Sequence, residues 1–147
     1  MTGGVVDFRW QFLPFRDARY SARMRKSIRS EHSEQVAFVA RVRHFYPQIV
    51  IFAIPNGGQR SITEASRLKA EGVLAGIPDL FIAKPVGNYS GLFVEMKRTK
   101  KSSLSATQKT RINALTTAGY KTHVAYGCDD AWAAFEEYIA QKSTVTM

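Results

Sequence analysis

The chain has 147 residues, of which 45% are hydrophobic and 12% aromatic, so it suits one packed domain and not a disordered protein. Its single cysteine, Cys128, excludes an intramolecular disulfide and a multi-cysteine zinc site. Lys and Arg number 21 against 12 Asp and Glu, and the resulting formal charge of +9 favours a polyanionic partner such as nucleic acid.

The apolar runs are too short to span a bilayer, and the first residues lack the basic and apolar regions of a secretory signal. We therefore expect an intracellular protein without a membrane segment, from the cytoplasm of a bacterium or a phage-infected host.

Residues 1–29 are predicted to form a basic, aromatic arm. This segment holds seven Lys or Arg residues against Asp7 and Asp17, with five aromatic side chains between them. Aromatic rings stack on bases and guanidinium groups neutralise phosphates, so the arm suits contact with nucleic acid. Packing on the domain or on a second subunit is an equally good interpretation, and the two are compatible.

A helix is predicted from Glu31 to about Tyr46, with Ser30 as its N-cap. Projection at 100° per residue puts Glu31 and Gln35 in the middle of its apolar stripe and Glu34 nearer the edge. A carboxylate on a buried face needs a partner, and a metal ion is one candidate. The alternative is a first-turn charge that complements the helix dipole.

The next segment, Ile49–Ile54, is predicted to be a buried strand because it is rich in β-branched residues. The turn sequence PNGGQRS follows at 55–61, and its exposed amides could hold a phosphate. A short amphipathic helix is predicted from Ile62 to Glu71.

The stretch GIPDLFIAKPVGNYSGLFVEMKR, residues 76–98, is predicted to form two apolar strands, Asp79–Lys84 and Gly91–Arg98. Residues i and i+2 of a strand share a face, so Glu95 and Lys97 should point the same way. If the two strands pair antiparallel, Asp79 approaches both.

A basic turn, KRTKKSS, leads into a capping box in which Ser105 is the N-cap and Gln108 reaches back. The helix should run to about Thr117. Further predicted elements are a strand over 120–126, a helix over 131–138 capped by Asp129 or Asp130, and a frayed tail over 142–147. Adjacent strands flanked by helices predict an α/β fold with a mixed sheet of about four strands for the domain at 30–141.

Charged groups inside apolar strands are costly unless something pairs with them. Two carboxylates, Asp79 and Glu95, would suit a Mg²⁺ or Mn²⁺ ion that lowers the pKa of a bound water, with Lys97 beside it to stabilise phosphate charge. Glu31 could add a ligand directly or through water. On spacing alone, an ion pair at a strand end is at least as good an explanation of these residues.

Four motifs, PNGGQR, RLKAEGVLAGIPDLFI, GLFVEMKR and LSATQ, occur in an order that resembles the VRR-NUC domain, the virus-type replication-repair nucleases of the PD-(D/E)xK superfamily. The resemblance covers about residues 30–138. It implies a restriction-endonuclease-like fold and DNA hydrolysis with a divalent metal. By position it assigns Asp79, Glu95, Lys97 and Gln108 to the active site and places the first-helix acid at Glu31 or Glu34. The helical projection favours Glu31 as that catalytic acid.

Stand-alone chains of this kind resemble homodimeric resolvases of four-way (Holliday) junctions, because a two-fold dimer presents two equivalent sites to such a substrate. A structure-selective DNA endonuclease involved in repair is therefore the predicted function. The alternatives are a non-catalytic DNA-binding module on the same fold and a small sequence-specific restriction-type endonuclease. Candidate DNA contacts are Asn56, Arg60, Arg67, Lys69, Arg98, Lys100 and Lys101.

Overall fold

The computed structural model of the protein describes residues 30–55 and 61–141. The predicted arm, the frayed tail and the candidate DNA contacts Asn56 and Arg60 lie outside the described residues. The described elements follow the predicted order: α2 (Glu31–Phe45), β1 (Ile51–Ala53), α3 (Ile62–Ala70), β2 (Leu80–Ile82), β3 (Leu92–Lys97), α4 (Ala106–Thr117), β4 (Lys121–Tyr126) and α5 (Cys128–Ile139).

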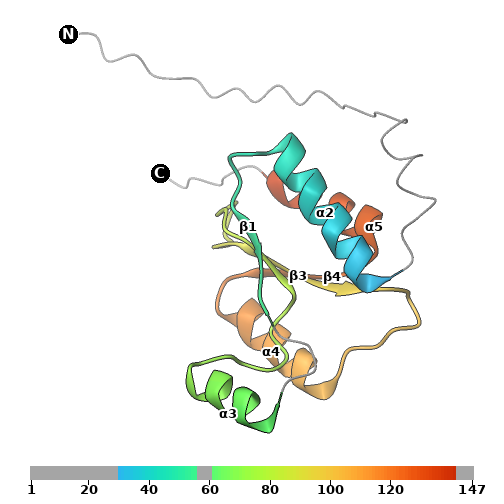
Figure 1. The fold of residues 1–147 in the computed structure, drawn as a ribbon. Coiled ribbons are helices and arrows are strands. Elements are labelled where there is room, and N and C mark those ends of the chain that lie inside the picture. Colours follow the sequence, from blue (N-terminus) through green and yellow to red (C-terminus); the bar gives the residue numbers. More distant parts are fainter. Residues whose placement is uncertain (1–29, 56–60, 142–147) are drawn as a thin grey trace.

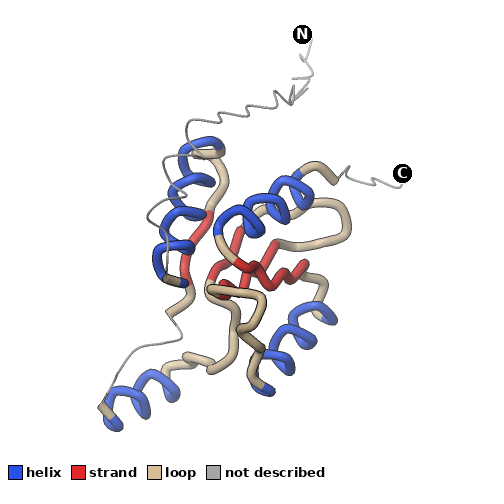
Figure 2. Tube along the Cα trace, turned by 90° about the vertical axis from the view of Figure 1, so that its right-hand side faces the viewer, coloured by secondary structure: helices blue, strands red, loops and turns tan. Residues whose placement is uncertain are grey.

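The four strands form one mixed sheet in the order β1-β2-β3-β4. Neighbours β1 and β2, and then β2 and β3, pair antiparallel, whereas β3 and β4 run parallel. Figure 1 shows α2 and α5 on one side of the sheet and α4 on the other, with α3 beyond α4. The same two layers of helices are visible from the side in Figure 2. The prediction of an α/β fold with a mixed four-stranded sheet is confirmed.

Side chains along the strands point alternately to the two faces of the sheet, and one of these faces forms the hydrophobic core. Leu80, Ile82, Val94 and Met96 are fully buried and lie on the side of the sheet that α2 and α5 cover. Phe38 and Phe135 meet edge to face between these two helices, with ring centroids 6.3 Å apart. The core therefore lies between the sheet and the α2–α5 pair, and the intervening strand residues face the α4 side.

Two sequence-based expectations were wrong in detail. The strand predicted over 49–54 is shorter and forms the edge of the sheet, so Ile51 is buried but Phe52 is 45% exposed. The last helix begins at Cys128, and its N-cap is Gly127 instead of Asp129 or Asp130. The positive φ of Gly127, 92°, makes a sharp turn directly after β4, so the helix starts three residues earlier than its apolar pattern indicates.

Within residues 30–55 and 61–141, the structure contains no helix with the length and apolar character needed to cross a membrane.

Candidate active site

Strand register places Asp79 opposite Glu95. Leu80 on β2 pairs with Val94 on β3 in the antiparallel ladder, so the residue before Leu80 faces the residue after Val94. Asp79 is anchored there, because its Oδ2 accepts a hydrogen bond of 2.8 Å from the backbone N–H of Met96. The approach of Asp79 to the Glu-x-Lys segment follows from this pairing.

Glu95 is the most buried charged group among the described residues, with 2% of its surface exposed. Its Oε1 lies 2.9 Å from Nζ of Lys97 and also accepts a hydrogen bond from the side-chain amide of Gln108. Lys97 in turn donates to Oε1 of Gln108 at 3.4 Å. The three side chains form a closed triangle in which each polar group has a partner.

Gln108 connects this triangle to the start of α4. Its Oε1 accepts the backbone N–H of Ser105 at 3.0 Å, while the Ser105 hydroxyl accepts the N–H of Gln108 at 3.2 Å. This is the capping box that the sequence predicts. Gln108 therefore completes the capping box of α4 and also forms hydrogen bonds with Glu95 and Lys97 on β3.

Gly76 allows the segment before Asp79 to pass close to α4. Its φ is +82°, and a Cβ at this position would lie 2.9 Å from the Thr107 methyl carbon and 3.0 Å from the Thr107 backbone. Only glycine fits such a close approach at positive φ. The Gly-Ile-Pro-Asp segment that leads to Asp79 therefore packs closely against the first turn of α4.

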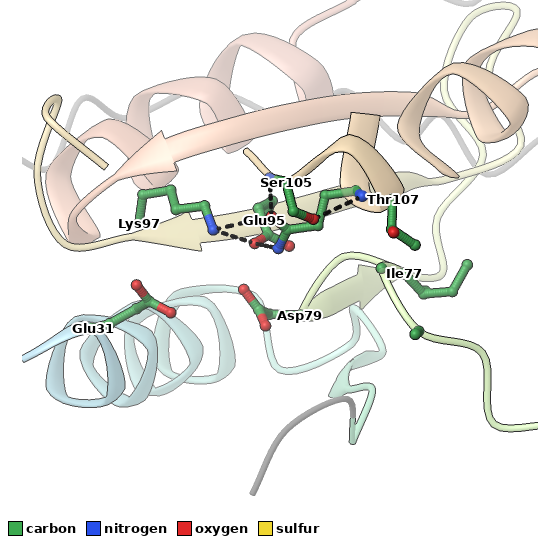
Figure 3. A pocket seen from close by; sticks show the side chains of 10 residues that line it. Glu31, Ile77, Asp79, Glu95, Lys97, Ser105 and Thr107 are labelled. Atoms are coloured by element: carbon green, nitrogen blue, oxygen red, sulfur yellow. Dashed lines mark hydrogen bonds and ion pairs between the residues drawn. The ribbon is translucent and has the colours of Figure 1, made fainter. Parts of the chain in front are cut away.

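These residues enclose a cavity of about 400 Å³, lined by Glu31, Ala75, Gly76, Ile77, Asp79, Glu95, Lys97, Ser105, Thr107 and Gln108. Figure 3 shows Glu31 and Asp79 on one side of the cavity, facing Glu95, Lys97 and the first turn of α4 on the other. The structure therefore brings together all five residues that the sequence indicates as catalytic.

The two glutamates at the start of α2 have different surroundings. Glu31 lines the cavity, whereas Glu34 turns to the start of α5 and accepts the backbone N–H of Cys128 at 2.6 Å. Sequence projection placed Glu31 in the buried stripe, but Glu31 is exposed to the solvent of the cavity. The bond of Glu34 to α5 gave no signal in the sequence, because it joins residues 94 positions apart.

Burial controls the protonation of the two central acids. It raises the pKa of Asp79, although the hydrogen bond from the Met96 N–H and the charge of Lys97 oppose the rise. Burial also raises the pKa of Glu95, against the hydrogen bond from Lys97, and the charge of Asp79 adds to the increase. For Lys97, burial favours the neutral form, but the hydrogen bond with Glu95 and the nearby acids outweigh it and raise its pKa.

The donor set fits a hard divalent cation. The negative charge of Asp79 raises the pKa of Glu95, because two carboxylates close together repel one another, and a cation could offset that repulsion. Three acids surround a single lysine at this cavity, so their ionised forms leave excess negative charge. In the part of the chain that the structure describes, no three His, Cys, Asp or Glu side chains are close enough together to form a complete metal site by themselves. Such an ion would need further ligands, from water or substrate phosphate.

The candidate DNA contacts within the described residues lie outside the cavity lining. Arg67 on α3 forms an ion pair of 3.0 Å with Glu71, so part of its charge is already engaged. Lys69, Arg98, Lys100 and Lys101 are exposed, and the last three follow directly after Lys97 at the end of β3. This exposed basic turn is the nearest positive surface in sequence to the acids.

Thr107 and Ile77 also line the cavity, although no pattern in the sequence points to a catalytic role for either. The only available signal was their position, beside Gln108 and Asp79 in the motifs LSATQ and GIPD.

A mixed sheet that carries an Asp, a Glu and a Lys on one face, flanked by helices, is the arrangement of a restriction-endonuclease-like α/β protein. The sequence profile of the VRR-NUC domain matches residues 17–129, and the chain therefore belongs to this family. The match begins inside the segment predicted as the arm. Among solved structures, a "VRR_NUC domain protein" has 29% sequence identity and a TM-score of 0.64, over 80% of this chain and 93% of the other.

A comparison with curated proteins found no match. Membership of the VRR-NUC family makes the chain a nuclease of the PD-(D/E)xK type, with DNA as its class of substrate.

Proposed function

We propose that the protein is a divalent-metal-dependent, structure-selective DNA endonuclease that hydrolyses phosphodiester bonds. The observation that carries this proposal is the pair of carboxyl groups on Asp79 and the buried Glu95, which the β2–β3 register places opposite one another beside Lys97. A structural ion pair would need only one acid for one lysine. A second acid, with Glu31 lining the same cavity, suits cation binding better.

Asp79 and Glu95 would hold a Mg²⁺ or Mn²⁺ ion, with Glu31 as the third acid of the site. When bound, such an ion lowers the pKa of a bound water and offsets charge on the scissile phosphate. Lys97 keeps its charge at neutral pH and neutralises negative charge that develops on the phosphate. Gln108 orients Glu95 and Lys97, because it donates to one and accepts from the other.

A four-way DNA junction is the substrate that we propose first, with the protein acting as a homodimer. The described residues of one chain supply a single set of Asp79, Glu95 and Lys97, so paired incisions on a two-fold symmetric substrate need two chains. The exposed turn of Arg98, Lys100 and Lys101 would contact phosphates on either side of the cut.

The test is a cleavage panel of four-way junctions, flaps and linear duplexes of matched sequence, each with Mg²⁺, with Mn²⁺ and with EDTA. Wild type should cut the junction with either metal, and Asp79→Asn and Glu95→Gln should bind the junction without cutting it. Sedimentation of the protein–junction complex measures how many chains bind.

Unchanged cleavage by both variants would reject the active site. Binding of junctions without cleavage under any metal would favour a non-catalytic binding module. Cleavage of unbranched DNA at one sequence would favour a restriction-type enzyme.

A further inference from the structure

We propose that Glu34 is a positioning residue, which locks the first turn of α2 to the corner after β4 and thereby holds Glu31 at the active-site cavity. This inference rests on the proposed function, because it concerns how one acid of the metal site is held.

The side chain of Glu34 caps a helix to which it does not belong. Its Oε2 accepts the backbone N–H of Cys128, the first residue of α5, at 2.6 Å. The N-cap of α5 is Gly127, which has no side chain to cap with. A carboxylate at a helix N-terminus is stabilised by both the free N–H groups and the helix dipole.

Other acids near the start of α5 are engaged elsewhere. Asp129 lies 3.4 Å from Arg41, and Asp130 accepts the backbone N–H of Tyr126 at 2.8 Å and approaches His123. Glu34 is therefore the acid that accepts the hydrogen bond from the backbone N–H of Cys128.

The corner at Gly127 is shaped to receive this carboxylate. Gly127 is buried with a φ of +92°, and a Cβ there would lie 3.3 Å from Oε2 of Glu34. That separation is tighter than ordinary carbon–oxygen packing. Gly127 therefore adopts the positive φ that the turn requires and leaves room for the carboxylate of Glu34.

The same corner is bonded to the catalytic strand. The backbone N–H of Gly127 donates to the carbonyl oxygen of Lys97 at 3.1 Å. Two consecutive amides, those of Gly127 and Cys128, therefore connect the end of β3 to the first turn of α2. Through Glu34, the helix that carries Glu31 is fixed relative to the strand that carries Glu95 and Lys97.

Glu31 needs this support because it is the first residue of α2. Helix ends fray, since their first N–H groups have no partner within the helix. The backbone N–H of Ser33 donates to the hydroxyl of the N-cap Ser30, which stabilises the turn internally but does not attach it to the site. Glu34 supplies that attachment from within the same turn.

The test is a double-mutant cycle read by Mn²⁺ binding in calorimetry, without DNA. Glu34→Ala should weaken Mn²⁺ binding by about tenfold, the lower end of what loss of a supporting partner costs a metal site. Glu31→Gln should weaken it at least as much. The double variant should match Glu31→Gln alone, because Glu34 acts through Glu31. Glu34→Gln keeps an acceptor oxygen and should restore most of the affinity.

Asp129→Ala is the matched control, since it removes one negative charge from the same helix end and should leave Mn²⁺ binding unchanged. Glu34→Asp keeps the charge, but its side chain is one carbon too short to reach Cys128. Its Mn²⁺ affinity should therefore match that of Glu34→Ala. This variant replaces Glu34→Ala in the measurement if the alanine variant does not fold.

Mn²⁺ affinity equal to wild type in Glu34→Asp, or additive losses in the double variant, would overturn the inference. If Asp79→Asn abolishes Mn²⁺ binding while the Glu34 variants bind normally, only the role of Glu34 fails. If the wild type binds no Mn²⁺, the proposed metal site and this inference fail together.

Discussion

At the scale of single residues, the two central acids have opposite effects on stability and on function. Burial raises the pKa values of Asp79 and Glu95, so the folded chain binds more protons than the unfolded chain between the ordinary and the raised values. The free energy of unfolding of the metal-free protein therefore falls as the pH rises through that window, and the penalty is complete above it. A metal ion would compete with the same protons.

We expect Asp79→Asn to stabilise the metal-free protein at pH 8, by about 0.5 to 2 kcal/mol, while abolishing cleavage. The amide oxygen can still accept the Met96 N–H, so the backbone contact survives. Urea denaturation in EDTA measures the difference, which should shrink as the pH is lowered towards 4, because wild-type Asp79 then becomes protonated. A gain that is constant with pH would contradict the assigned cause.

Lys97 is expected to affect cleavage much more than DNA binding. Lys97→Met should lower the cleavage rate by about 10² to 10³, the usual effect of removing one group that stabilises developing charge. Loss of the ammonium group also removes a partner that lowers the pKa of Glu95. The pH at which Mn²⁺ binding is half-complete should therefore rise, and calorimetry across pH 5 to 9 checks it. Lys109→Met, at an exposed position of α4 outside the cavity lining, is the control for loss of one positive charge.

At the scale of elements, α4 is coupled to the site through its N-terminus. Ser105 and Gln108 cap the helix reciprocally, and Gln108 also contacts both Glu95 and Lys97. A defect in the cap should therefore reach the acids. In contrast, α3 begins with a Ser61 cap bonded to the Glu64 N–H, and none of its residues is buried.

We expect Ser105→Ala to cost about 1 kcal/mol of stability and also to reduce cleavage, because Gln108 loses the bond to its N–H and with it part of its alignment. Ser61→Ala is the matched control, since it removes an equivalent cap from a helix whose described residues do not line the cavity. Thermal denaturation and cleavage assays of both variants separate the two effects. Equal cleavage rates would show that the α4 cap has only a structural role.

At the scale of the whole molecule, charge is distributed unevenly. The chain carries a formal net charge of +9, yet the cavity brings three acids around one lysine. A basic chain attracts DNA, whereas the acids of the candidate site would repel phosphates unless a cation offsets them. Attraction and catalysis therefore depend on different parts of the sequence.

Deletion of residues 1–26 should weaken DNA binding and flatten its dependence on salt concentration. The segment contains six Lys or Arg and two Asp residues, and each phosphate contact that is lost reduces the number of counterions released on binding. Binding titrations of a catalytically inactive Asp79→Asn protein, with and without the segment, over a range of salt give the slopes. Equal slopes would place the arm in packing or assembly.

Sequence predicted the elements well because their local signals agree with the tertiary structure. The capping box at Ser105, the alternation around Glu95 and the helical spacing around Phe38 each depend on neighbours within a few residues. The predictions were wrong where contacts between residues far apart in the chain determine the ends of an element or its place in the sheet. Strand β1 is an edge strand because of its place in the sheet order, and α5 begins early because Gly127 turns the chain and Glu34 completes the cap.

The sequence by itself identified the residues that we propose to carry the chemistry: Asp79 before one strand, Glu95 and Lys97 on one face of the next, and Gln108 in the helix that follows. Only the tertiary structure decided how they meet, because the β2–β3 register, the close approach at Gly76 and the placement of Glu31 at the cavity depend on contacts between residues far apart in the chain. Periodicity reports which way a side chain points from its own element. Which residue of another element that side chain meets is determined by tertiary packing.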